Sequence, residues 1–195
     1  MRSTEKEYWY LVWDKFKNGD SEAFKTIYNE FTDALFAYGS KITSNRDLLK
    51  DSIQDLFIDV YTYGSKLRQP ELLEFYLFKT LKRIIIKKLK EDQRFSAMNE
   101  DFERFDLKFT IEDEVFGKDS EKKLKLLQKE ISQLAPASRE LLFLKFNSGL
   151  SYEAIAKIVG IKPDSAKKQI YRIVQRLRKD MDSKNLELFM MCFTA

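Results

Sequence analysis

Apolar residues recur at helical spacing through the first half of the chain. One apolar stripe follows Asp20, and a second lies between about residues 46 and 61. The first stripe consists of Phe24, Ile27, Tyr28, Phe31, Leu35, Tyr38 and Ile42, and the second of Leu49, Ile53, Leu56, Phe57 and Val60. A repeat of three to four residues is typical of an amphipathic helix, and Asp20 is a suitable N-cap. Because alternating β-branched residues are scarce, the pattern predicts an all-α fold.

The same period returns in the second half. It predicts a helix over 121–134, and Pro136 can begin the next helix because the first turn does not need its missing N–H. Gly149 is expected to end that helix. The sequence thus predicts two amphipathic helices before residue 150.

Start and stop signals mark two further helices. Ser151 is a candidate N-cap for a short helix over 152–159, and Gly160 suits the left-handed residue that often follows a helix. Pro163 can open a final helix that runs to about Asp180. A short helix, a turn that contains glycine and a longer basic helix together predict a helix-turn-helix.

The final helix separates a cationic face from an apolar one. The cationic set is Ser165, Lys168, Gln169, Arg172 and Arg176, and the apolar set, about 110° away, is Ala166, Ile170, Ile173 and Leu177. Cationic, amide and hydroxyl groups contact phosphates and base edges in a major groove. We therefore predict DNA binding here, with an ordinary solvated helix face as the alternative.

Charge is concentrated in three segments. Residues 79–94 hold seven basic and two acidic residues, 98–119 hold three basic and eight acidic, and 162–179 hold seven basic and one acidic. The middle segment also lacks a sustained helical period. This pattern predicts two small helical domains, 1–93 and 120–195, joined by an acidic linker at 94–119. Two cationic segments suit contact with a polyanion at two places, although two solvated faces and an acidic loop would give the same charges.

Three aspartates in the second predicted helix recur every four residues. Asp51, Asp55 and Asp59 therefore share one face and repel one another. Such a ladder is open to three interpretations: a metal site, a solvated face, or a docking surface for a basic protein partner. We favour docking, because the sequence indicates no further metal ligands.

A predicted loop over 62–74 mixes aromatic and cationic residues. Lys66 and Arg68 lie between Tyr63 and Tyr76, and a basic stripe follows. The stripe is Lys79, Arg83, Lys87, Lys90 and Arg94. Rings stack on unpaired bases while cations neutralise phosphates, so this region is a candidate for single-strand binding. Packing in the core or at its rim is the alternative for each tyrosine.

Composition excludes several chemistries. The 195-residue chain has no His and one Cys, so a Ser-His-Asp triad, a His-bearing zinc site and an internal disulfide are excluded. Glycines are too far apart for a phosphate-binding loop, and no apolar run is long enough to span a bilayer. We expect a cytoplasmic protein without membrane insertion, cofactor, metal or enzymatic activity.

Both halves resemble the extracytoplasmic-function group of bacterial RNA polymerase sigma factors. The segment ISQLAPASRELLFLKFNSGLSYEAIAKIVGIKPDSAKKQIYRIVQRLRKDM resembles region four, and GDSEAFKTIYNEF, DSIQDLF and YLFKTLKRIIIKKLK resemble region two in order and spacing. The resemblance implies that region two binds core polymerase and the melted −10 promoter element. It also implies that region four binds the −35 duplex.

The resemblance assigns roles to individual residues. Core polymerase contacts would be Asp51, Gln54, Asp55 and Phe57; −10 contacts would be Tyr63, Lys66, Arg68, Tyr76, Lys79, Lys82 and Arg83; −35 contacts would be Arg139, Ser165, Lys167, Lys168, Gln169, Arg172 and Arg176. It further implies a transcription initiation factor that is a monomer when free of polymerase and is controlled by an anti-sigma factor. An autonomous helix-turn-helix regulator is the alternative, and a metal-dependent nuclease and a helical adaptor are further rivals.

Overall fold

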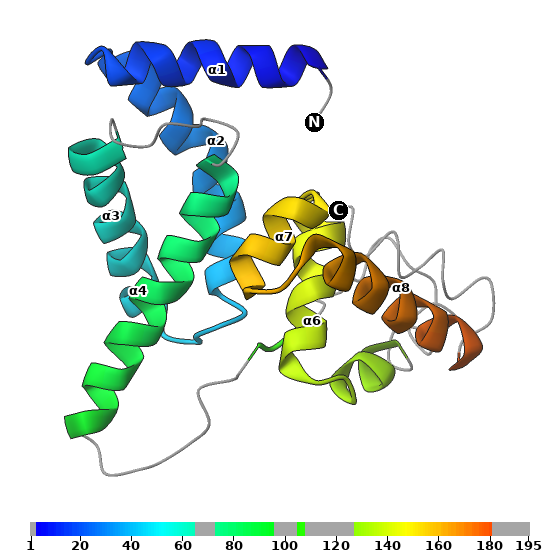
Figure 1. Cartoon of the computed structure of the whole chain (residues 1–195). Helices are drawn as coiled ribbons and strands as arrows, with labels where there is room; N and C mark the ends of the chain where they lie inside the picture. The colour runs from blue at the N-terminus through cyan, green and yellow to red at the C-terminus, as the bar shows by residue number, and fades with distance from the viewer. Residues whose placement is uncertain (1–2, 65–72, 96–104, 108–126, 181–195) are drawn as a thin grey trace, which may run out of the picture. The chain divides into compact units, whose positions relative to one another are not determined.

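The computed structural model describes residues 3–64, 73–95, 105–107 and 127–180, and every regular element in these ranges is helical (Figure 1). The all-α prediction is therefore confirmed. The chain divides into two compact units, Met1–Phe102 and Glu103–Ala195. This division falls within the acidic stretch that the sequence assigns to a linker. No helix in the described ranges is long and apolar enough to cross a membrane.

The described part of the N-terminal unit contains four helices. They are α1 (Ser3–Lys17), α2 (Ser21–Gly39), α3 (Arg46–Tyr63) and α4 (Leu73–Phe95). Helices α2, α3 and α4 pack against one another, while α1 lies across the start of α2 and the end of α3 (Figure 1). At that crossing, the Phe16 ring contacts Phe24, and a Cβ on Gly64 would lie 2.9 Å from the Phe16 ring. A small residue at position 64 therefore allows α1 to sit close to α3.

Side-chain caps fix where α2 and α3 begin. Asp20 Oδ1 accepts hydrogen bonds from the backbone N–H of Glu22 at 2.9 Å and of Ala23 at 3.2 Å, which confirms Asp20 as the N-cap. Asn45 Oδ1 accepts in the same way from Asp47 and Leu48, so Asn45 caps α3.

Most of the two apolar stripes is buried, with three exceptions. Phe24 is half-buried at the edge of the groove described below. Tyr28 is 42% exposed because its position on α2 faces an open groove, and Ile42 lies beyond the end of the helix at Gly39. The buried members are Ile27, Phe31, Leu35 and Tyr38 on α2, and Leu49, Ile53, Leu56, Phe57 and Val60 on α3.

The described part of the C-terminal unit is also built from helices. Residues 127–132 are helical and precede α6 (Pro136–Leu142), which continues as the π-helical segment η3 (Phe143–Asn147). Then follow α7 (Tyr152–Val159) and α8 (Pro163–Asp180). Pro136 is at the start of α6, and Gly149, with a φ of 65°, follows the end of η3, as predicted.

Two apolar residues of the acidic stretch pack into the C-terminal unit. Phe105 and Leu107 are each only 4% exposed, and the Phe105 ring meets the Phe143 ring edge to face at 5.7 Å. At the other side of the stretch, α4 continues to Phe95. The acidic stretch is therefore structured at its start and at residues 105–107, and at the latter the burial of two apolar side chains outweighs the lack of helical periodicity.

Candidate nucleic-acid and partner-binding surfaces

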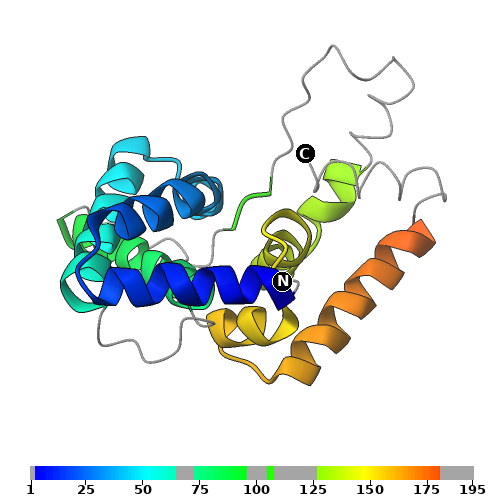
Figure 2. The same ribbon diagram turned by 90° about the horizontal axis from the view of Figure 1, so that it is seen from above.

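Helices α7 and α8 form the helix-turn-helix that the sequence predicts (Figure 2). Ser151 Oγ accepts from the Ala154 backbone N–H at 3.2 Å and caps α7. Gly160 has φ 77° and ψ 33°, which is the left-handed conformation that glycine adopts without steric cost. Pro163 then begins α8. The three predicted signals at this turn are confirmed.

Lys145 stabilises the start of the helix-turn-helix. Lys145 Nζ donates to the Leu150 carbonyl oxygen at 3.1 Å and lies 4.7 Å from the centre of the Tyr152 ring. The contacts tie η3 to the first turn of α7. They restrict how α7, and hence the turn to α8, can move.

Helix α8 presents a cationic face to solvent. Its apolar residues Ala166, Ile170, Ile173 and Leu177 are buried. Of the residues assigned to DNA, Lys167, Lys168, Gln169, Arg172 and Arg176 are exposed, and Ser165 is half-buried. Tyr171, which is 65% exposed, lines a shallow hollow of about 370 Å³ together with Arg172, Gln175, Arg176 and Lys179. Tyr171 is not among the predicted contacts. Its position outside the apolar stripe of α8 would have allowed its exposure to be predicted from the sequence.

Arg139 lies on α6 and is partly buried. Its Nε donates to the Leu134 carbonyl oxygen at 3.1 Å, so one edge of the guanidinium holds the turn before α6. The resemblance assigns this residue to a phosphate contact. The structure adds a local structural role to that assignment.

The N-terminal unit carries a second cationic surface on α4. A hollow of about 640 Å³ is lined by Lys79, Lys82, Arg83, Ile86, Lys87, Lys90 and Glu91. Lys79, Arg83, Lys87 and Lys90 are exposed, and Lys82 is half-buried. Lys79 Nζ also lies 5.2 Å from the centre of the Phe75 ring. The structure therefore brings five of the basic residues together on one helix.

The tyrosines near α4 occupy helices. Tyr63 is exposed at the last residue of α3, whereas the sequence predicts a loop from residue 62, and Tyr76 is half-buried in the first turn of α4. Lys66 and Arg68 lie outside the described residues. Of the assigned −10 residues, the structure therefore describes Tyr63, Tyr76, Lys79, Lys82 and Arg83.

The aspartate ladder forms an exposed acidic stripe on α3. Asp51, Gln54 and Asp55 are exposed, and Asp59 is half-buried. Asp55 Oδ2 lies 2.7 Å from Lys88 Nζ on α4. Within the described residues, no cluster of three or more His, Cys, Asp or Glu side chains could hold a metal ion. The stripe therefore lacks the geometry of the metal alternative.

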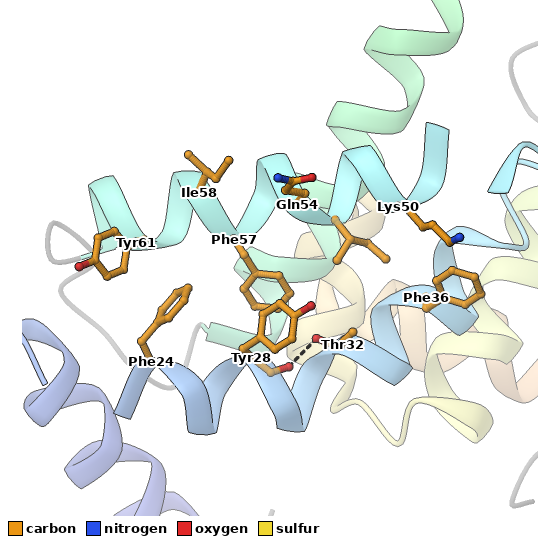
Figure 3. Close-up of a pocket in the computed structure, with 10 residues that line it drawn as sticks. Phe24, Tyr28, Thr32, Phe36, Lys50, Gln54, Phe57, Ile58 and Tyr61 are labelled. Carbon is orange, nitrogen blue, oxygen red and sulfur yellow. Dashed lines mark hydrogen bonds between the residues drawn. The ribbon is translucent and has the colours of Figure 1, made fainter. Parts of the chain in front are cut away.

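An aromatic groove runs between α2 and α3 beside this stripe (Figure 3). It has a volume of about 590 Å³ and is lined by Phe24, Tyr28, Thr32, Phe36, Lys50, Ile53, Gln54, Phe57, Ile58 and Tyr61. The Tyr28 and Phe57 rings are tilted relative to each other, with their centres 4.6 Å apart, and the Phe24 and Tyr61 rings meet edge to face at 5.2 Å. A partner that bound both surfaces would meet apolar rings next to carboxylates.

Phe57 forms the floor of this groove. It is 4% exposed, whereas the resemblance places it among the surface contacts with core polymerase. Ile58 and Tyr61 are exposed on the same helix, and Tyr28 is exposed on α2. These three residues are contact candidates that the sequence does not predict, because the face on which a residue emerges depends on how α2 and α3 pack.

Comparisons with known proteins agree with both halves of the chain. The family model described as Sigma-70, region 4 matches residues 124–177. RNA polymerase sigma factor SigV of Bacillus subtilis (strain 168) is 24% identical over 157 residues, which is 80% of this chain and 87% of the relative. The sigma factor RpoE of Bartonella quintana, solved in complex with the anti-sigma factor NepR, has a similar fold: TM-score 0.57, 21% identity, 82% of this chain and 97% of that chain.

Proposed function

Because this chain is a bacterial RNA polymerase sigma factor of the extracytoplasmic-function group, we propose that three separate surfaces divide the work of promoter recognition. It is a transcription initiation factor that directs RNA polymerase to promoters. The observation that carries the proposal is the Gly160 turn, which joins α7 to an α8 whose cationic side chains are exposed within the region-four match.

Helix α8 would read the −35 duplex. Lys168, Gln169 and Arg172 are proposed to face base edges, because bidentate cationic and amide groups discriminate bases in the major groove. Phosphate contacts would come from Arg139, Lys167 and Arg176, with Ser165 at the start of the helix. Phosphate contacts position the helix, and base contacts specify the sequence.

The cationic face of α4 would hold the melted −10 strand. Lys79, Lys82 and Arg83 are proposed to neutralise phosphates, and Tyr63 and Tyr76 to stack on unpaired bases, together with Lys66 and Arg68. Stacking contributes about 1–3 kcal/mol per base. Because these contacts favour single strands over duplex, binding would shift the equilibrium towards melted DNA.

The acidic stripe and aromatic groove would dock core RNA polymerase. Asp51, Gln54 and Asp55 suit a partner surface with cationic groups, and the adjacent groove suits apolar side chains above Phe57. Complementary charge would guide the encounter, and buried apolar area would prolong the complex. Tethering both DNA-binding units to one polymerase raises the effective concentration of the second contact.

The remaining properties follow from this role. We propose that the chain performs no covalent chemistry, needs no cofactor, acts in the cytoplasm and is a monomer when free of polymerase. An anti-sigma factor is a proposed further partner. The similar RpoE chain was solved with one.

Run-off transcription tests the proposal directly. Purified chain is added to core RNA polymerase freed of sigma factors, with a library of promoter templates. We expect template-selective transcripts with the wild type and their loss with Asp51→Lys combined with Gln54→Ala. Failure of the wild type to confer selectivity would refute the proposed function.

The alternative of an autonomous regulator predicts a different result. Such a protein binds a two-fold site as a dimer and needs no polymerase. It also leaves the acidic stripe and aromatic groove without a use. Specific DNA binding by a dimer of this chain, undiminished by Asp51→Lys with Gln54→Ala, would favour that alternative.

A further inference from the structure

The ion pair between Lys88 and Asp55 joins α4 to the acidic stripe of α3. Lys88 Nζ lies 2.7 Å from Asp55 Oδ2, a distance typical of a charge-assisted hydrogen bond. The Lys88 side chain is 28% exposed and that of Asp55 is 51% exposed. The cation is therefore mostly covered by protein, while the carboxylate still faces outward.

Lys88 does not share the cationic face of α4. At about 100° per residue, it lies on the order of 140–180° around the helix from Lys79, Arg83 and Lys90. Its ammonium group contacts α3, whereas the others line the hollow on the far side. Lys88 therefore interacts with the acidic stripe on α3 and does not belong to the cationic surface of α4.

The ion pair also offsets charge repulsion at the centre of the aspartate ladder. Asp51 and Asp59 lie four residues to either side of Asp55, and like charges at this spacing repel. An ionised carboxylate can accept about four hydrogen bonds through its two oxygens. Since the ion pair with Lys88 uses Oδ2, Asp55 retains capacity to accept a bond from a partner.

We propose that Lys88 is a positioning residue for partner docking: it holds Asp55 in the orientation in which its outward edge receives a cationic group of core polymerase. The inference rests on the proposed function of the acidic stripe. A side chain that is already ordered loses less conformational freedom on binding, so the complex forms more favourably.

The alternative role for Lys88 predicts a change in partner affinity in the opposite direction. If Lys88 acted only as a positive charge near the docking surface, its removal would make the stripe more negative. A basic partner would then bind more tightly. The direction of the change in affinity therefore separates positioning from simple charge.

The experiment measures binding of the fluorescently labelled full-length chain to sigma-free core polymerase by anisotropy. Lys88→Met is expected to raise Kd about threefold to tenfold. This change corresponds to the conformational entropy that the Asp55 side chain, no longer held by Lys88, would lose on binding. Lys88→Arg, which can still reach Asp55, should stay within about twofold of wild type. The matched control is Lys25→Met, which removes an exposed α2 lysine that pairs loosely with Glu22 at 3.5 Å. It should leave Kd unchanged.

A double-mutant cycle with Asp55→Asn decides whether the effect passes through Asp55. Lys88→Met should have no further effect once Asp55 is neutral. Measurements are made at a temperature at which circular dichroism finds every variant folded. Unchanged or tighter binding by Lys88→Met, or an equal loss in the Asp55→Asn background, would overturn the proposal.

Failure of the docking surface itself gives a different result. In that case Asp51→Lys with Gln54→Ala would bind polymerase like the wild type. If that variant loses binding while Lys88→Met does not, the acidic stripe docks polymerase and only the positioning role of Lys88 is refuted.

Discussion

At the scale of single residues, Gly160 has the most restrictive backbone in the helix-turn-helix. Its φ of 77° is left-handed, and an added Cβ would meet no atom within 4 Å. Any penalty for substitution therefore comes from the backbone and not from a clash. For Gly160→Val we expect a loss of about 1–2 kcal/mol in the free energy of unfolding. Chemical denaturation of the full chain measures it.

Gly160→Asn is the control for this prediction. Asparagine tolerates the left-handed region better than a β-branched residue does. It should therefore lose clearly less stability than valine. Equal losses for the two variants would mean that the conformation of residue 160 is not the cause.

Phe57 and Ile58 are neighbours in sequence with different expected roles. Phe57 is buried under the groove, so Phe57→Ala should cost about 3–5 kcal/mol of stability. Ile58 is 54% exposed, so Ile58→Ala should cost less than about 1 kcal/mol and yet weaken binding to core polymerase. Denaturation and anisotropy, measured on both variants, separate folding from docking. Full polymerase affinity in Ile58→Ala would remove that residue from the interface.

At the scale of helices, the sequence predicts helix boundaries best where capping residues, glycine and proline agree with the hydrophobic periodicity. Ser151, Gly160 and Pro163 predict the bounds of α7 and the start of α8, because each acts on backbone within three residues of itself. Asn45 carries the same kind of signal at the start of α3, although it is not among the predicted caps. Local chemistry therefore accounts for the helix-turn-helix almost completely.

Features that depend on contacts between distant segments could not be predicted in this way. The burial of Phe105 and the pairing of Lys88 with Asp55 both depend on which segments meet. The same holds for the candidate docking site. Its acidic residues are visible in the sequence as an i, i+4 ladder, whereas the aromatic groove exists only once α2 and α3 pack together.

The two halves of the α8 face should respond differently to substitution. Lys167→Ala with Arg176→Ala removes two proposed phosphate contacts, so binding should weaken for all sequences and the salt slope should fall by roughly 2. Lys168→Ala with Arg172→Ala should instead relax sequence preference, by about 1–3 kcal/mol for each bidentate interaction with a base that is removed. The measurement is binding of polymerase holoenzyme to matched and scrambled −35 duplexes over a series of salt concentrations. Indistinguishable behaviour of the two pairs would refute the division between them.

At the scale of the whole molecule, the acidic stretch has a part in folding as well as in connection. Its net negative charge makes contact with DNA unfavourable, which suits a segment between two cationic surfaces. Yet Phe105 and Leu107 belong to the C-terminal unit by burial. The functional C-terminal module is therefore expected to begin before residue 105, upstream of the matched region at 124–177.

Phe105→Ala tests this extension of the module. The ring is almost fully buried against Phe143, so its loss should destabilise the C-terminal unit by about 3–5 kcal/mol. Asp106→Ala, at the exposed residue between the two anchors, is the matched control and should change stability little. Hydrogen exchange on the full chain reads the two units separately. Faster exchange is expected in α6, α7 and α8 of Phe105→Ala, with α2 and α3 unchanged. If α6 to α8 exchange as slowly as in the wild type, the anchor does not stabilise the helix-turn-helix, and the module begins after it.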